Sequence, residues 1–155
     1  MPAGPSPTGI VLRIIRSEAR IAVTVSVPLL PTNTVDESGV TAILDWEGAH
    51  LGDPVEDLGW LCVKSWRFGA VDKPAGGFGS REELWQAYAA AGGAKVDPAR
   101  AHWWEVLGTA RWGIICHNQA WRHLSGSIKS MELASIGRRA VETEVDLLQL
   151  LKAGG

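Results

Sequence analysis

The sequence has few cysteines, no long apolar run and no excess of positive charge. Its two cysteines, Cys62 and Cys116, lie in apolar segments, and we expect reduced core thiols instead of a disulfide or a metal site. No run of about 18 uncharged apolar residues occurs, so no membrane span is expected. The net charge of -2 and the pI near 6.1 provide no basic surface for nucleic acid. The N-terminus lacks a signal-peptide pattern, which favours a cytoplasmic protein.

The first 31 residues differ in composition from the rest of the chain. Met1–Gly9 is rich in Pro, Gly and Ser, a composition typical of disorder. Ile10–Val27 is apolar and β-branched but is interrupted by charges, and its pattern fits a strand or a helix equally poorly. We therefore expect an ill-defined segment over residues 1–31 and one folded domain over residues 32–152. A chain of 155 residues with 46% hydrophobic content can bury a core of that size.

A strand with an acidic loop at its end is the central feature of the chain. Val40–Leu44 alternates like a short half-buried strand, and the turn signal Asp36–Gly39 predicts a second strand before it, hence a β-hairpin. After the strand come four ionisable residues of the loop: Asp45, Glu47, His50 and Asp53. Carboxylates gathered at a strand end favour a hard cation such as Mg²⁺.

Helices are predicted for the remainder of the chain. Asp53 and Pro54 are the N-cap and first residue of a helix that reaches Trp66. The glycine-dense segment 67–79 is a surface connection, with anion binding as the weaker alternative. Further helices run from the capping box Ser80–Glu83 to Gly92, from Asp97 to about Leu124, and from Ser130 to Leu151. The predicted class is α+β and mostly α: a short β-hairpin followed by four or five helices.

The helix from Asp97 to Leu124 carries two apolar stripes, which predicts a central helix with neighbours on two sides. The first stripe contains Trp103, Val106, Ala110, Gly113, His117, Ala120 and Leu124, and the second contains Trp104, Leu107, Arg111, Ile115 and Asn118. His117 is interpreted as a core position, with an acceptor cleft as the alternative. The last helix is expected to turn Leu133, Ile136, Ala140, Leu147 and Leu151 inward, and Gly137 indicates a close helix contact.

The motifs Leu44–Glu47 (LDWE), Gly52–Pro54 (GDP) and Asp57-Leu58 resemble, at this spacing, the aminoglycoside phosphotransferase family of small-molecule kinases. The similarity extends from about Val35 to Leu151, and the sequence after the motifs resembles the family's actinobacterial-type branch, which is related to the kinase-like domain of the acyl-CoA dehydrogenase 10 group. It implies the carboxyl-terminal lobe of a protein-kinase-like fold over residues 32–152. It also implies ATP and Mg²⁺ as cofactors and a small-molecule hydroxyl, either a hydroxyacyl metabolite or an antibiotic, as acceptor.

The resemblance also assigns roles to single residues. Asp45 takes the place of the family's metal-binding aspartate, and Asn33 lies near the second metal ligand, about one residue closer to Asp45 than the family pattern requires. Glu47 is either near the metal or acceptor or a solvated loop carboxylate. His50 is interpreted as a loop hydrogen-bonding residue. Asp53 and Asp57 are expected to support the site, Asp53 as a helix cap and Asp57 as a buried acceptor that braces the catalytic loop.

Two parts of a phosphotransferase are not found in this sequence. Where the family has His-Gly-Asp, with the aspartate as catalytic base, the chain reads Ser26–Pro28, and proline cannot accept a proton. Every lysine follows the metal motif, on the wrong side for the phosphate-binding lysine. We therefore expect a truncated or frame-damaged family member that is inactive as it stands, with a divergent start as the alternative.

Two other functional classes are alternatives to a phosphotransferase. A non-catalytic helical binding module is the main alternative to an enzyme, and a metal-dependent hydrolase is a distant third. Apolar surface that a further lobe would cover predicts self-association.

Overall fold

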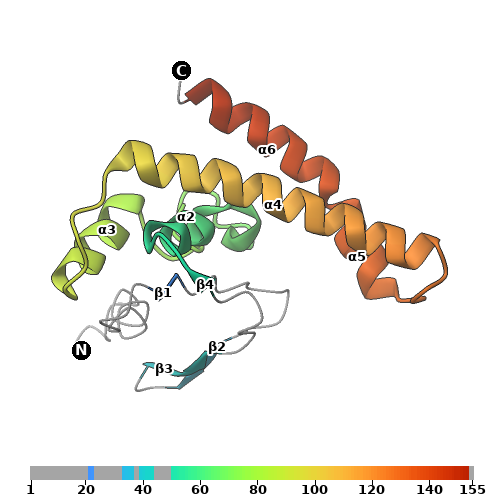
Figure 1. Cartoon of the computed structure of the whole chain (residues 1–155), viewed down its shortest axis with the longest axis horizontal. Helices are drawn as coiled ribbons and strands as arrows, with labels where there is room; N and C mark the ends of the chain where they lie inside the picture. The colour runs from blue at the N-terminus through green and yellow to red at the C-terminus, as the bar shows by residue number, and fades with distance from the viewer. Residues whose placement is uncertain (1–20, 23–32, 37–38, 44–49, 154–155) are drawn as a thin grey trace. The chain divides into compact units, whose positions relative to one another are not determined.

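The computed structural model describes residues 21–22, 33–36, 39–43 and 50–153 (Figure 1). Over these residues the chain is mostly helical with little strand, which confirms the predicted mostly-α α+β class. The expected N-terminal segment, apart from Ile21–Ala22, and the residues Asp45 and Glu47 lie outside the described residues.

Two small antiparallel strand pairs precede the helices. Strand β2 (Asn33–Asp36) pairs with β3 (Gly39–Ile43), with Asn33 opposite Ile43 and Asp36 opposite Gly39. Strand β1 (Ile21–Ala22) pairs with β4 (His50–Leu51). Residues 37–38, where the hairpin turn was predicted, are outside the described part of the chain.

The chain divides into two compact units, Met1–Glu105 and Val106–Gly155. The first contains the strands, α2 (Val55–Cys62), the 3₁₀ helix η2 (Lys64–Arg67), α3 (Arg81–Ala90) and the start of α4 (Pro98–Leu124). The second contains the rest of α4, α5 (Met131–Arg138) and α6 (Ala140–Ala153). The single helix predicted up to Trp66 is wrong, because Val63 adopts an extended ψ of 131° that ends α2.

The predicted helix starts follow from side-chain capping. Ser80 Oγ accepts from the amide of Glu83, while Glu83 Oε2 accepts from the amide of Ser80 at 2.8 Å, which is a complete capping box. Asp97 Oδ1 accepts from the amide of Ala99 and thereby caps α4. The predicted bounds of α4, from Asp97-Pro98 to about Leu124, are confirmed.

The helix predicted from Ser130 to Leu151 is divided in two at Arg139. Hydrogen bonds of the i to i+3 type, from Arg139 N to Ile136 O and from Glu142 N to Arg139 O, tighten the chain there and end α5. The close contact predicted at Gly137 is confirmed, since a Cβ there would lie 2.6 Å from Ala120 Cβ. Leu151 was expected to point inward but is exposed, because the buried face of α6 is formed by Ala140, Thr143 and Asp146.

The buried face of α4 differs from both predicted stripes. It is formed by Ala101, Glu105, Thr109, Trp112 and Cys116, whereas Trp103, Leu107 and Leu124 are exposed. His117, interpreted as a core position, is also exposed. Hydrophobic periodicity alone indicated the wrong faces, because two of the buried positions, Glu105 and Thr109, are polar.

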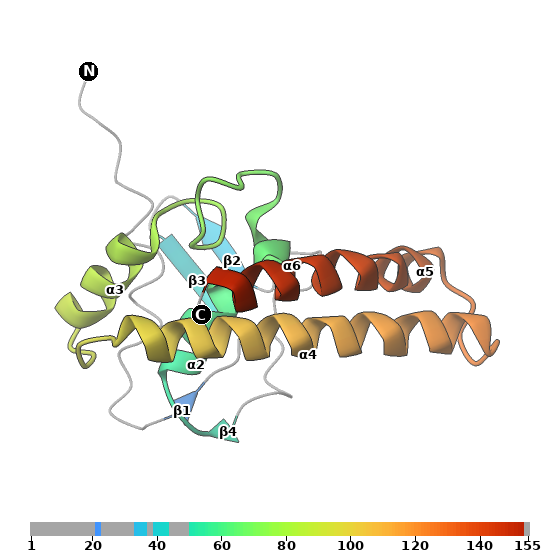
Figure 2. The ribbon, with the colours of Figure 1, turned by 90° about the horizontal axis from the view of Figure 1, so that it is seen from above.

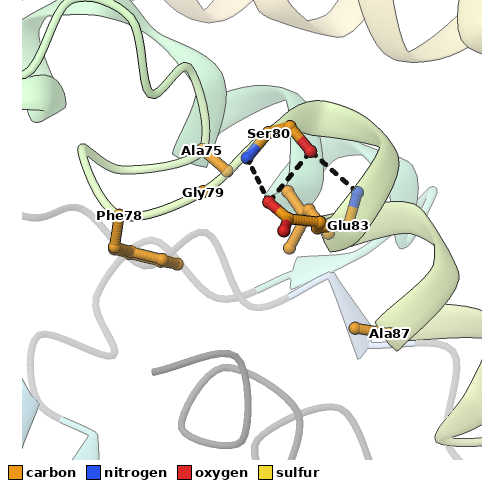
Figure 3. A pocket seen from close by; sticks show the side chains of 7 residues that line it. Ala75, Phe78, Gly79, Ser80, Glu83 and Ala87 are labelled. Atoms are coloured by element: carbon orange, nitrogen blue, oxygen red, sulfur yellow. Dashed lines mark hydrogen bonds between the residues drawn. The ribbon is translucent and has the colours of Figure 1, made fainter. Parts of the chain in front are cut away.

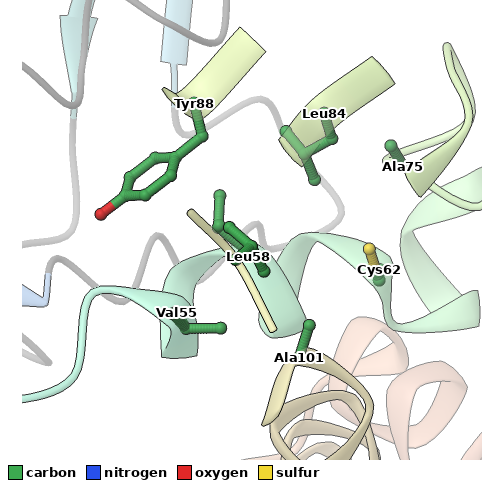
Figure 4. Close-up of a cluster of buried hydrophobic side chains, with 8 residues drawn as sticks. Val55, Leu58, Cys62, Ala75, Leu84, Tyr88 and Ala101 are labelled. Atoms are coloured by element: carbon green, nitrogen blue, oxygen red, sulfur yellow. The ribbon is translucent and has the colours of Figure 1, made fainter. Parts of the chain in front are cut away.

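The core of the first unit lies between α2, α3 and the start of α4. Its buried residues are Val55, Leu58, Cys62, Ala75, Leu84, Tyr88, Val96 and Ala101. Figure 4 labels all of them except Val96. Gly59 allows α2 to approach α4 closely, because a Cβ there would lie 2.4 Å from Trp104 Cβ. Both cysteines are free and buried, as predicted. Among the described helices, none is long and apolar enough to cross a membrane.

Candidate functional site

The candidate site is the segment from β3 to the first turn of α2, which holds the motifs of the sequence analysis. Asn33 begins β2 and is paired with Ile43, the last residue of β3. Asp45 follows Ile43 by two residues in the sequence. Asp45 and Glu47 are outside the described residues, so their predicted metal role stays a prediction. The pairing of Asn33 with the end of β3 nevertheless brings its backbone to the strand end that Asp45 follows.

The Asp53 side chain accepts hydrogen bonds from three residues. Its Oδ1 accepts from the amide of Val55 at 3.0 Å, which is the hydrogen bond of an N-cap, and Pro54 has helical dihedral angles. Its Oδ2 accepts from Arg100 Nε and from the indole Nε1 of Trp104, both at 2.6 Å. Asp53 therefore joins the start of α2 to the start of α4.

The hydrogen bonds of Asp53 lower the pKa of its carboxyl. Partial burial by itself would raise the pKa of the Asp53 carboxyl, but the donors on Val55, Trp104 and Arg100 lower it below the ordinary value of 3.8. The carboxylate is consequently ionised at neutral pH, as charge-assisted hydrogen bonds to a guanidinium require.

The other motif residues lie close to Asp53. His50 Nε2 is 3.1 Å from Glu56 Oε2, so this histidine hydrogen-bonds across the loop, in agreement with the sequence interpretation. Asp57 is half-buried in the first turn of α2. Burial, and then the negative charges of Asp53 and Asp57, raise the pKa of the Tyr88 phenol. Both aspartates thus impose a negative potential on this end of the α2–α3 core.

A second polar cluster is centred on Glu105, which is only 2% exposed. Arg81 forms a bidentate pair with it, with Nε to Oε2 at 3.1 Å and Nη2 to Oε1 at 2.6 Å. Arg67 Nη2 donates to Glu105 Oε1 at 3.2 Å and to the carbonyl of Cys62 at 3.0 Å. The cluster ties together α2, η2, α3 and α4, which makes it a structural support.

The environment of Cys62 beside this cluster is strongly perturbed. Burial, together with the charge of Glu105, raises the pKa of the Cys62 thiol to about 12. Because only the thiolate is nucleophilic, Cys62 is inert at neutral pH. The sequence interpretation of a core thiol is confirmed.

The loop 67–79 was interpreted as a connection and not as an anion cradle. The amides of Ala70, Lys73 and Phe78 donate to carbonyls of the loop itself, so they are engaged within it. The small pocket beside the loop is lined by Ala75, Phe78, Gly79, Ser80, Glu83, Leu84 and Ala87 (Figure 3). The Ser80 and Glu83 groups in the pocket are occupied by the capping box, which favours the structural role.

Metal binding by the described residues alone is not supported. Within 50–153 and the described strand residues, no group of three His, Cys, Asp or Glu side chains is placed to hold a metal ion. The predicted metal ligands Asp45 and Glu47 lie in segment 44–49, outside the described residues. Asparagine and aspartate oxygens, the donors of Asn33 and Asp45, are hard ligands of the kind that Mg²⁺ prefers.

Sequence reasoning missed the partners that hold the motif in place. Arg100 and Trp104 bind Asp53 from 47 and 51 residues away, and Arg81 binds Glu105 across 24 residues. Arg100 offered one sequence signal for its pairing with an acid. It lies in the first turn of a helix, where a cation is unfavourable unless a nearby acid compensates its charge.

Comparison with known proteins supports the interpretation of this segment. Among curated proteins and among solved structures, none gives a significant match to the chain. Residues 31–98, which include the β2–β3 pair, the acidic segment, α2 and α3, match the family model described as the phosphotransferase enzyme family.

Proposed function

We propose that this chain is a relative of the ATP- and Mg²⁺-dependent phosphotransferases that act on small-molecule hydroxyls, and that it corresponds to their carboxyl-terminal lobe. The observation that supports this most is the coincidence of two signals. The first signal is the Asp45–Leu58 motif, and the second is the family match over residues 31–98, which contains the whole motif. The match also covers the β2–β3 pair and helices α2 and α3. We further propose that the chain belongs to the branch of these phosphotransferases that is related to the acyl-CoA dehydrogenase 10 kinase-like domain, because the sequence downstream of the motif resembles that branch.

In this proposal Asp45 holds Mg²⁺, with Asn33 as the second ligand and Glu47 near the metal or the acceptor. Mg²⁺ supplies neutralisation of the nucleotide phosphate charge when it is bound. The contribution of the described residues is positional. Asp53, held by Arg100 and Trp104, fixes the end of the acidic loop against α4. The proposed support of the site by Asp57 stays a prediction.

A specific observation favours a second candidate, a binding module without transfer activity. Pro28 stands where the family has its catalytic aspartate, and proline has no side-chain group that accepts a proton. Loss of a general base alone removes about 10²–10⁴-fold of rate. We therefore propose that the chain as given retains metal binding but does not transfer phosphate.

We also propose a cytoplasmic location, which the buried free thiols support.

Metal binding can be tested with Mn²⁺ as a paramagnetic probe. Mn²⁺ with ATP should broaden the indole NMR signal of Trp46, identified with Trp46→Phe, because Trp46 neighbours Asp45 in the sequence. Asp45→Asn should abolish the broadening, whereas Asp72→Asn, which removes an exposed loop carboxylate, should leave it unchanged. Binding in the millimolar range is expected for so few carboxylates. Equal broadening in Asp45→Asn would reject the metal assignment.

Phosphate transfer from ATP to an acceptor is tested in a separate assay. The purified chain with ATP, Mg²⁺ and a panel of hydroxy acids and aminoglycosides should release no ADP above the rate of the Asp45→Asn variant. Turnover that depends on Asp45 would reject the non-catalytic proposal and establish the enzyme.

A further inference from the structure

Helix α5 packs in the second unit without a buried residue of its own. It follows α4 after a short turn and lies beside the C-terminal half of that helix (Figures 1 and 2). The structure describes all 8 residues of α5, and none of them is buried. One close approach to α4 is at Gly137, where an added Cβ would lie 2.6 Å from Ala120 Cβ. A helix of this length is not stable by itself in water, so α5 depends on the interactions that fix its ends.

A histidine of α4 fixes the start of α5. The amide of Ser130, the N-cap residue of α5, donates to Nδ1 of His123 at 3.2 Å. The Ser130 hydroxyl in turn accepts from the amide of Leu133 at 3.4 Å, which is the hydrogen bond of an N-cap. His123 and Ser130 are both half-buried. The bond between them therefore joins the last turn of α4 to the first turn of α5.

The bond from Ser130 to His123 exists only while Nδ1 of the imidazole carries no proton. A neutral imidazole has its proton on one ring nitrogen and accepts on the other, whereas the protonated ring has a proton on both. Because Nδ1 is the acceptor here, the neutral ring carries its proton on Nε2. Protonation of Nδ1 would place two donors against each other. The positive charge on His123 and the bond to Ser130 therefore exclude each other.

The charged groups of α4, the turn and α5 act in both directions on the protonation of His123. Arg122 on α4 and Lys129 in the turn oppose a further positive charge, although Arg122 also donates to Gln119 Oε1 at 3.0 Å. Glu132 in the first turn of α5 and the C-terminal carbonyls of α4 favour the charge. Histidine is the side chain that ordinarily changes charge between about pH 5 and 8. Acidification across this range is therefore the condition in which the bond is expected to open.

We propose that His123 makes the attachment of α5 to α4 dependent on pH. At neutral and alkaline pH its Nδ1 holds the Ser130 amide, and α5 lies against α4. At acidic pH the bond opens and α5 separates from α4 more often. Because no residue of α5 is buried, its separation exposes little apolar surface and is an opening of low cost. Separation uncovers Ala120, which Gly137 contacts in the closed state. This proposal is independent of any phosphotransferase activity.

Amide hydrogen exchange of the full chain at about pH 7.5 and about pH 5.5, corrected for the intrinsic exchange rate at each pH, tests the proposal. We expect the protection of the amides of residues 134–138 to fall about 3–10-fold at the lower pH, which is the effect of one hydrogen bond. His123→Asn should make this protection independent of pH, because an asparagine amide can accept from Ser130 but does not titrate. His117→Asn is the matched control: it removes the other histidine of the second unit, an exposed one, and should retain the wild-type fall. Circular dichroism should show unchanged helix content in both variants, because neither histidine is buried.

Four results would overturn the proposal. Nitrogen NMR spectra of the wild-type imidazoles at the higher pH could show the proton of His123 on Nδ1, which is incompatible with the bond to Ser130. The protection of α5 could be the same at both pH values. It could fall as much in His123→Asn as in the wild type, or it could cease to fall in His117→Asn. Either of the last two results would assign the pH dependence to another group.

Discussion

Removal of the Glu105 carboxylate should be among the most destabilising single changes in this chain. Glu105 is almost completely buried and is hydrogen-bonded by Arg81 and Arg67, the latter with a side chain only 11% exposed. Glu105→Ala removes the carboxylate that binds both guanidinium groups and leaves a cavity beside them. Breaking a buried ion pair by removal of one partner costs about 3–5 kcal/mol.

The expected order of the stability losses in three variants tests whether the broken buried ion pairs cause the destabilisation. Glu105→Gln preserves the shape and part of the hydrogen bonding but removes the charge, and should cost roughly 1–3 kcal/mol. Arg81→Met should cost less than Glu105→Ala, because Arg81 is 32% exposed and Glu105 keeps its bond to Arg67. Asp72→Ala, a change at an exposed loop carboxylate, is the control and should be within about 0.5 kcal/mol of wild type.

Urea unfolding followed by tryptophan fluorescence measures these differences, because Trp66 is buried in the first unit. The corresponding decrease in Tm for Glu105→Ala is roughly 6–20 °C for a chain of this size. A Glu105→Ala variant within about 1 kcal/mol of wild type would refute the reasoning. It would mean that the burial cost of the three charges already cancels their attraction.

Three further predictions concern single side chains. Trp112→Ala should lower the free energy of unfolding by about 3–5 kcal/mol, because the indole is buried; a near-neutral effect in urea unfolding would contradict this. Gly59→Ala should lower Tm, because the added methyl collides with the backbone and Cβ of Trp104; an unchanged melting curve would show that α2 and α4 can separate without cost. The folded-state pKa of Asp53 is lowered, so its contribution to stability is complete above its unfolded pKa of about 4 and is lost as the pH falls through the lower folded value. Asp53→Asn should therefore flatten the stability profile below about pH 4, and an identical acid profile would contradict the assignment.

Local signals in the sequence predicted the helix starts well. Ser80 with Glu83, and Asp97 with Pro98, satisfy the free amides of a first helical turn with neighbouring side chains, and both helices begin where these residues predict. The contact at Gly137 was also predictable, since a mid-helix glycine is costly unless another helix needs its space.

Long-range pairing was not predictable in the same way. Glu105 reads as a surface residue in a helix pattern, and only the folded chain brings Arg81 and Arg67 to it. Trp103 and Leu107 read as core residues because they are large and apolar, but the buried face lies on another side of α4. Periodicity identifies an apolar side of a helix and does not tell whether this chain covers it.

The site itself was predictable only as a motif. Asp53 was expected to cap α2, and its side chain does bond the Val55 amide, but its two strongest partners come from α4. The roles of Asn33, Asp45 and Glu47 remain predictions, since the described residues do not include the segment that would bring them together.

The loop from Arg67 to Gly79 has a consequence for proteolysis. A glycine-dense surface loop ordinarily offers a protease the extended backbone that its active site requires. Here the Arg67 side chain is bonded to the carbonyls of Cys62 and Val71, and Gly77 N donates to Lys73 O. Trypsin can therefore cut after Arg67 only once these bonds open, whereas the bond after Lys73 precedes Pro74 and resists trypsin. Cleavage after Arg67 thus reports transient unfolding around Glu105 and not the length of the loop.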